Sequence, residues 1–244
     1  MRIWGITDRG LVRKENQDTF IFHTFDDGAY GFAAVCDGMG GARAGGVASR
    51  QASEVFQKEL FSLLPNMDAK AIPELLIGVV ESANRSMFLR SATEPECMGM
   101  GTTAVAVVKG LADEAYIVNV GDSRCYLVDD QSITQVTRDH SLVSDLVARG
   151  DITPEQARNH PNKNLITRVL GVEERVKPDV FQVRCREGSY LLLCSDGLSN
   201  IVTDPELLYE VIHGGEPEDC CQRLLEVALS RGAPDNVTAV LVEL

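Results

Sequence analysis

The stretch "YLLLCSDGLS" at residues 190–199 runs through five apolar residues and then ends on an aspartate and a glycine. A near-copy, "GFAAVCDGMGG", lies upstream at residues 31–41. Each apolar run is typical of a buried strand, and each ends on an Asp-Gly pair. One such ending would be ordinary turn chemistry, because Asp-Gly is a common turn pair. Two such endings in one chain indicate that the two aspartates point toward a common site.

Two further aspartates lie beside strand-like runs: Asp122 follows residues 115–121, and Asp235 precedes residues 236–244. In a sandwich of sheets, strand ends gather at one edge, so these acids are expected to converge with Asp37 and Asp196. Close carboxylates repel one another by several kcal/mol unless they are protonated or neutralised by a cation. Oxygen ligands favour Mg²⁺ or Mn²⁺. Taken singly, each aspartate is better explained as a turn former.

The composition is that of an ordinary globular protein, with 244 residues, 44% of them hydrophobic and 24% charged. The net charge of −13 argues against a general binder of nucleic acids or anionic membranes, because both reward an excess of lysine and arginine. The seven cysteines show no CxxC spacing, which predicts a reducing, cytoplasmic compartment without disulfides or zinc. No signal peptide or membrane span is expected, since no apolar run is long enough.

Ten strands are predicted from runs rich in Val, Ile, Leu and aromatic residues, and no linker divides them. They cover residues 2–7, 18–24, 31–36, 102–109, 114–120, 124–129, 131–135, 177–184, 189–194 and 236–244. Short links at 128–132 and 185–189 indicate hairpins, and hairpins give antiparallel sheets.

Helices are predicted from apolar residues at helical spacing over residues 44–64, 73–89 and 218–230. Two shorter helices are expected farther along: one stopped by Gly150, and one opened by Thr153 as N-cap, with Pro154 and a capping box to Gln156. Many strands with separate blocks of helix predict the α+β class, as a single domain built on a β-sandwich flanked by helices.

Seven blocks of the sequence, in order, resemble the signature blocks of the metal-dependent protein phosphatases, the PPM or type-2C serine/threonine family. The resemblance runs from Asp8 to Val242, and the compact length is similar to the bacterial branch. The blocks are "DRGLVRKENQD" (8–18), "VCDGMGG" (35–41), "MGMGTTAV" (98–105), "VGDSRCYL" (120–127), "TRDHSLV" (137–143), "CSDGL" (194–198) and "APDNVTAVLV" (233–242).

The resemblance implies a central antiparallel β-sandwich with helices on both faces, a flap at about 137–171, and two divalent metal ions, Mn²⁺ or Mg²⁺, at one edge. A hydroxide bridging the two metals would hydrolyse phosphoserine and phosphothreonine in proteins. By position, Asp37 and the Gly38 carbonyl hold metal, and so do Asp196 and Asp235. Asp122 would help to bind a third ion.

Two further residues take roles by resemblance. Asp18 matches an acid that orients metal-bound water, and Arg13 matches the arginine that grips the substrate phosphate. A guanidinium offers a planar fork to two phosphate oxygens, which lysine cannot match. The alternative for Arg13 is a surface ion pair with Glu15 or another nearby acid.

The sequence also departs from the family. Gln17 stands where many relatives have glutamate, which predicts weaker metal binding there unless Asp18 compensates. Met39 and Ala42 occupy positions where relatives can have histidine, a candidate general acid. His160 or a metal-bound water is left as the proton donor, and His140 is expected to fix the base of the flap.

Three functions compete. The first is an active phosphatase that opposes a serine/threonine kinase in bacterial signalling. Its partners would be phosphoprotein substrates. It is expected to be a monomer that binds neither nucleic acid nor membrane. The second is an inactive relative that binds phosphoproteins without hydrolysing them, and Gln17 is the one feature in its favour. The third is a structural cation-binding domain, but the acids are scattered and do not form an EF-hand loop.

Overall fold

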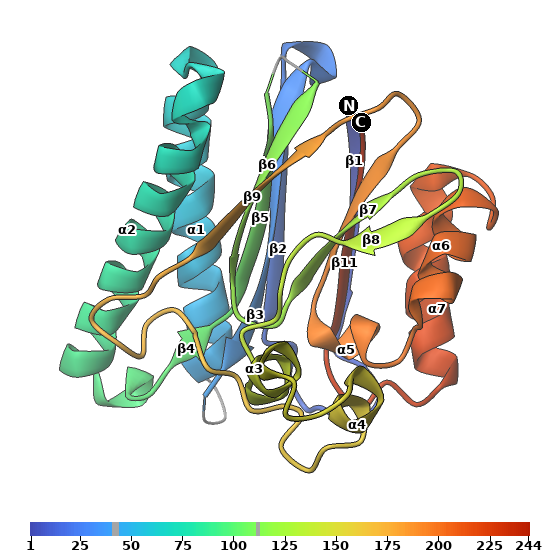
Figure 1. Ribbon diagram of the computed structural model, residues 1–244. Coiled ribbons are helices and arrows are strands. Elements are labelled where there is room, and N and C mark those ends of the chain that lie inside the picture. The colour runs from blue at the N-terminus through green and yellow to red at the C-terminus, as the bar shows by residue number, and fades with distance from the viewer. Residues whose placement is uncertain (41–43, 111–112) are drawn as a thin grey trace.

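The computed structural model describes residues 1–40, 44–110 and 113–244, and two antiparallel sheets stacked face to face form its centre (Figure 1). One sheet has the strand order β1-β11-β10-β7-β8, and the other has the order β2-β3-β5-β6-β9 with β4 paired to β3. The strands are β1 (Arg2–Asp8), β2 (Asp18–Phe25), β3 (Tyr30–Met39), β4 (Gly101–Thr102), β5 (Ala104–Lys109), β6 (Glu114–Val120), β7 (Arg124–Val128), β8 (Ile133–Gln135), β9 (Asp179–Arg184), β10 (Tyr190–Cys194) and β11 (Val237–Glu243).

Helices cover both outer faces of this sandwich, with α1 and α2 on one side and α6 and α7 on the other (Figure 1). The predicted α+β class and the flanked β-sandwich are therefore confirmed. The helices are α1 (Ala44–Leu63), α2 (Ile72–Thr93), α3 (Leu142–Arg149), α4 (Pro154–Arg158), α5 (Asp196–Ser199), α6 (Asp204–Ile212) and α7 (Cys220–Ser230). In the described residues, no helix combines the length and apolarity needed to cross a bilayer.

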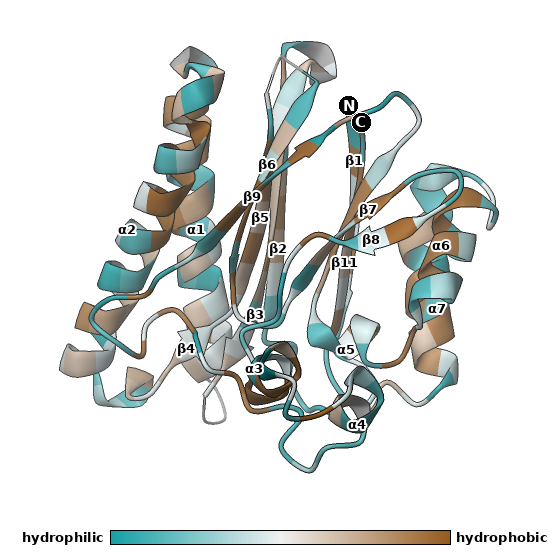
Figure 2. Ribbon diagram, in the orientation of Figure 1, coloured by the Kyte–Doolittle hydropathy of each residue, from teal (hydrophilic) through white to brown (hydrophobic). Residues whose placement is uncertain are grey.

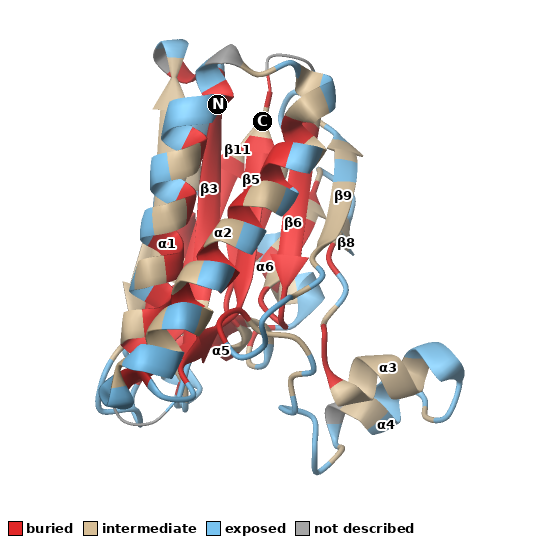
Figure 3. Cartoon of the chain, turned by 90° about the vertical axis from the view of Figure 1, so that its left-hand side faces the viewer, coloured by how far each residue is buried: buried red, intermediate tan, exposed pale blue. Residues whose placement is uncertain are grey.

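The two quoted apolar runs become central strands because both faces of each are covered. In β3, Phe32 and Cys36 face the helices α1 and α2, while Ala33 and Val35 face the other sheet. A strand covered on both faces has no wet side, so it reads as a continuous apolar run instead of an alternating one. The central strands β3, β5 and β6 are accordingly rich in apolar residues in Figure 2 and buried along most of their length in Figure 3.

One expectation about local structure is wrong, and two helices were not expected. The link at 185–189 is not a hairpin, because β9 pairs with β6 in one sheet and β10 pairs with β7 and β11 in the other. The chain crosses between sheets there. Helices α5 and α6 were not predicted, although α6 carries a start signal: the Glu206 carboxylate accepts the Thr203 N–H at 2.9 Å.

The segment that contains α3 and α4 stands away from the sandwich (Figure 3). Its helices are set by local caps, as predicted. Ser141 caps the start of α3, Gly150 ends it in the left-handed conformation (φ +80°), and Thr153 forms the expected capping box with Gln156. No residue of α3 is buried, so caps rather than a core define this helix.

Candidate metal centre

The predicted acids lie together at one end of the sandwich. Asp18 opens β2 and pairs in register with Asp37, which lies near the end of β3. Asp196 begins α5 directly after β10, Asp122 lies in the turn between β6 and β7, and Asp235 comes two residues before β11. Strands of both sheets therefore deliver carboxylates to the same place, although up to 217 residues separate the acids in sequence (235 − 18).

The backbone of Asp37 is fixed by threonines from the block at 98–105. Its N–H donates to the Thr103 hydroxyl at 3.1 Å, and its carbonyl accepts from the Thr103 N–H at 2.9 Å and the Thr102 hydroxyl at 2.8 Å. The Thr103 hydroxyl in turn bonds the Ser123 hydroxyl at 2.7 Å, beside Asp122. These bonds hold two of the acids in a fixed relation.

Four other acids of the centre act on the buried Asp37. Burial and the charges of Asp18, Asp196, Asp122 and Asp235 hold its pKa well above the ordinary value. Burial and Asp235 also raise the pKa of Asp196, which a hydrogen bond with Asp37 partly offsets. A carboxylate surrounded by four others must be protonated or neutralised, and a divalent cation would neutralise it.

Asp18 and Asp122 are buried and each has an oxygen without a partner. Burial raises the pKa of Asp18 to about 6, although the Thr238 hydroxyl donates to its Oδ2 at 2.6 Å. Burial and the charge of Asp196 raise the pKa of Asp122 to about 7. Oδ1 of both residues has no hydrogen-bond partner among the described residues. A buried oxygen without a partner is costly, so each points to a ligand.

Two glycines let the strand ends approach closely. A Cβ on Gly38 would lie 2.1 Å from the Gly45 carbonyl at the start of α1. A Cβ on Gly197 would lie 1.9 Å from the Asn236 carbonyl. Any side chain at these positions would push apart the loops that carry Asp37, Asp196 and Asp235.

Arg13 reaches the acids through Asp235, with Nη2 donating to Oδ2 at 2.7 Å. The ion pair considered as the alternative for Arg13 thus exists, but its partner is an acid of the centre. Asn236 fixes the loop that carries Arg13, since its side-chain amide donates to the carbonyls of Arg9 (2.9 Å) and Glu15 (3.0 Å) and accepts the Gln17 N–H (2.9 Å). Arg13 is therefore presented to the centre on a supported loop.

The buried His140 joins the segment with α3 and α4 to the turn that carries Asp122. Its Nδ1 accepts the Gly121 N–H at 3.1 Å, so the neutral ring carries its proton on Nε2 and donates to Asp179 at 3.1 Å. Burial lowers the pKa of His140, which favours this neutral form. Arg168 binds the other oxygen of Asp179 at 3.0 Å. His140 thus fixes the base of the segment, as predicted.

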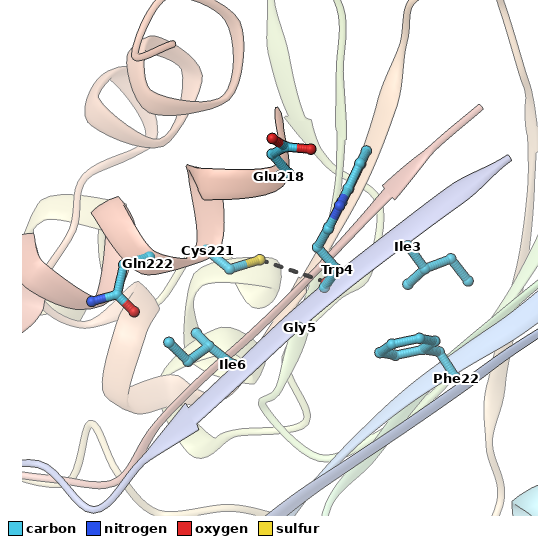
Figure 4. Close-up of a pocket in the computed structure, with 8 residues that line it drawn as sticks. All are labelled: Ile3, Trp4, Gly5, Ile6, Phe22, Glu218, Cys221 and Gln222. Carbon is cyan, nitrogen blue, oxygen red and sulfur yellow. Dashed lines mark hydrogen bonds between the residues drawn. The ribbon is translucent and has the colours of Figure 1, made fainter. Parts of the chain in front are cut away.

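A groove of about 990 Å³ opens beside the carboxylates, with Asp122 and Asp196 in its wall. A smaller pocket of about 370 Å³ lies between β1, β2 and α7, beside the middle of β1 (Figure 4). Trp4, Phe22 and Cys221 line it, and the Cys221 thiol donates a hydrogen bond to the Trp4 carbonyl at 3.6 Å. Burial also raises the pKa of that thiol to about 11, so the pocket offers no reactive group.

The acids fit a site for hard divalent cations. They supply oxygen donors alone, three of them (Asp37, Asp196 and Asp235) keep some surface accessible, and Asp18 and Asp122 add oxygens without partners. Across residues 1–40, 44–110 and 113–244, no three His, Cys, Asp or Glu side chains already have the spacing of a closed metal site. The acids are therefore neighbours whose oxygens do not yet surround one point, and bound ions would have to draw those oxygens together.

All predicted site residues gather here, and the structure adds supporting residues that sequence reasoning missed. These are Thr102 and Thr103, Ser123, Asn236 and Thr238. The one feature of the sequence that could have pointed to these residues is that each lies in one of the seven blocks shared with the phosphatase family. Ala42, noted for the missing histidine, lies outside the described residues.

Comparison with known proteins agrees with this geometry. The family model described as "Protein phosphatase 2C" matches residues 12–227. The serine/threonine phosphatase stp of Listeria monocytogenes is 38% identical over 238 residues, which cover 97% of this chain and 93% of that protein.

Solved structures are similar over the whole length. The serine/threonine phosphatase Stp1 from Staphylococcus aureus has a TM-score of 0.91 at 35% identity, covering 99% of this chain and 94% of that one. The catalytic domain of the phosphatase PstP, in complex with two manganese ions, has a TM-score of 0.85 at 34% identity, covering 99% and 97%. Sequence, fold and the gathered acids agree: the chain belongs to the protein phosphatase 2C family and is a serine/threonine protein phosphatase.

Proposed function

We propose that the chain hydrolyses phosphoserine and phosphothreonine in proteins at a pair of Mn²⁺ or Mg²⁺ ions held by Asp37, the Gly38 carbonyl, Asp196 and Asp235. Asp122, with Asp196, would hold a third ion. When bound, the ions neutralise the acids and activate water for attack on phosphorus. The gathering of Asp37 with four other aspartates at one end of the sandwich is the observation that carries the proposal, because two of them, Asp18 and Asp122, have a buried oxygen with no partner among the described residues.

The chain's own residues supply the rest of the chemistry. Asp18 has one oxygen bonded to the Thr238 hydroxyl and one free of protein partners, so it can accept a hydrogen bond from the attacking water and orient it. Arg13, more than half exposed at 55%, can turn from Asp235 to two phosphate oxygens when substrate arrives. Attack by water breaks the phosphorus–oxygen bond, and the leaving alkoxide takes a proton from solvent or a bound water.

Several wider features belong to the same proposal. Residues 1–244 would work as one phosphatase domain, with the segment at about 137–171 as a flap beside the centre. The enzyme would act as a monomer against phosphoproteins, among them a serine/threonine kinase and its targets. A cytoplasmic location fits substrates of that kind. Its relatives are named serine/threonine phosphatases, and these names support phosphoproteins as the substrates.

The test is turnover of p-nitrophenyl phosphate and of a phosphothreonine peptide. Turnover should require Mn²⁺ or Mg²⁺, stop with EDTA, and fall by more than about a hundredfold in Asp37→Asn or Asp196→Asn, because several kcal/mol of charge stabilisation are lost. Asp130→Asn is the matched control, since Asp130 is an exposed acid in the β7–β8 turn. Turnover in EDTA, or full activity in Asp37→Asn, would refute the proposal; peptide binding without hydrolysis would support the inactive relative.

A further inference from the structure

The groove beside the carboxylates is lined by polar and apolar side chains together, and the chemistry of phosphate hydrolysis does not need the apolar ones. Val143 and Val147 of α3 line one wall, and Ile201, between α5 and α6, lines the wall opposite. Its volume of about 990 Å³ lies at the upper end of the range of roughly 300–1,000 Å³ for ligand pockets. The groove is therefore large enough for several side chains of a polypeptide.

Helix α3 has an apolar face with no core to pack on. Leu142, Val143, Leu146 and Val147 recur at helical spacing, yet none of them is buried. Figure 3 shows α3 and α4 standing off the sandwich, joined to it by two extended segments. A face of this kind, held in place by caps, is suited to contact a partner that enters the groove.

The groove is continuous with the candidate metal centre, which identifies its occupant. Asp122 and Asp196 belong both to the groove wall and to the cluster of acids. A polypeptide whose phosphate lies at the acids would therefore place its neighbouring residues in the groove. The occupant is the substrate itself, rather than a separate partner.

The charges in the groove give little reason to select charged residues. Arg124 is held by Asp139 at 2.7 Å, and Arg138 is held by Asp145 at 2.9 Å. The exposed Lys163 and the exposed Asp204 add one charge of each sign. With the arginines paired, the apolar walls are the feature that remains for recognition.

We propose that this groove binds apolar side chains adjacent to the phosphoresidue, so that the enzyme prefers phosphoproteins with leucine, isoleucine or valine near the phosphorylated position. This inference rests on the proposed function, since it assumes that the phosphate is bound at the acids. Burying one such side chain on a preformed wall gives a preference of about tenfold or more.

The test compares two phosphothreonine peptides that are identical except for leucine or asparagine at the positions flanking the phosphoresidue. The wild-type enzyme should show a kcat/KM for the leucine peptide at least about ten times that for the asparagine peptide. The variant Val143→Asn/Val147→Asn should lose this preference and keep its turnover of p-nitrophenyl phosphate within about twofold. Ile201→Asn, on the opposite wall, should lose the preference as well.

The matched control is Ile77→Asn/Leu89→Asn, which changes two exposed apolar residues of α2, outside the groove. It should retain the preference of the wild type. Equal rates for the two peptides, or an intact preference in both groove variants, would overturn the inference while p-nitrophenyl phosphate turnover stays normal. Loss of metal-dependent p-nitrophenyl phosphate turnover in the wild type would overturn the proposed function instead, and this inference with it.

Discussion

Arg13 and Asp235 bind each other at 2.7 Å, and this contact sets what either residue can do before substrate arrives. Asp235 is the main cause of the raised pKa of Arg13. The same carboxylate is a candidate metal ligand, so the ion pair and a metal ion compete for it. Binding of cations at Asp235 would free the guanidinium for phosphate.

Replacing Arg13 therefore has opposite effects on substrate and on metal. Arg13→Ala should raise the KM for a phosphothreonine peptide about 10- to 100-fold, because a charge-assisted hydrogen bond contributes roughly 1.5–3 kcal/mol. Mn²⁺ affinity, measured by calorimetry, should be unchanged or tighter. Arg9→Ala, on the same loop, is the control. An unchanged KM would mean that the ion pair with Asp235 is the whole role of Arg13.

Single residues of the centre differ in how far sequence could predict them. Asp37, Asp122, Asp196 and Asp235 were recognisable because each lies next to an apolar run, a local signal. Thr103 and Asn236 were not recognisable from local sequence. Thr103 bonds the backbone of a residue 66 positions away, and Asn236 bonds backbone groups 219 or more positions away. Only the folded chain brings these groups together. Their chemical type alone does not distinguish them from surface threonine or asparagine.

At the scale of elements, the base of the segment that contains α3 and α4 depends on His140. Its ring accepts from the buried Gly121 N–H and donates to Asp179, which links the turn that carries Asp122 to β9. The N–H of His140 also donates to the Gly121 carbonyl at 2.9 Å. The turn is therefore held from two sides by one residue.

His140→Ala should lower the free energy of unfolding by about 2–4 kcal/mol, because it leaves the buried Gly121 N–H without an acceptor and removes the bond to Asp179 Oδ2. His140→Asn should recover part of the loss, since its amide oxygen can still accept the Gly121 N–H. Urea denaturation measures both, with His213→Ala at the end of α6 as the control. If the alanine and asparagine variants were equally stable, the Gly121 bond would not be the contact that matters.

Elements were predicted best where their determinants are local. The caps at Thr153 and Gly150 fixed the ends of α4 and α3, and the long apolar stripes fixed α1 and α2. The link between β9 and β10 was misread because a short turn looks alike whether it returns to the same sheet or crosses to the other. Sheet membership is decided by the partners of each strand, β6 for β9 and β7 and β11 for β10, which no local pattern shows.

For the whole molecule, the fold places several acids where they destabilise it unless cations are bound. The native pKa of Asp18 is about 6 and that of Asp122 about 7, both above the ordinary 3.8. At these two acids the native state therefore binds more protons than the unfolded chain between about pH 4 and 7, and their contribution lowers the stability as pH rises through that window. At roughly 1.4 kcal/mol per pKa unit, the loss reaches a few kcal/mol.

The thermal shift produced by Mn²⁺ at about pH 5 and about pH 7.5 tests this account most directly. In EDTA the Tm should be lower at pH 7.5 than at pH 5, and Mn²⁺ should raise it by about 5 °C or more at pH 7.5 and much less at pH 5. Asp122→Asn removes one of the repelling acids, so its Tm in EDTA at pH 7.5 should exceed that of the wild type. Equal stability at both pH values in EDTA, with the same Mn²⁺ shift at each, would contradict the claim that buried, mutually repelling acids form the metal centre.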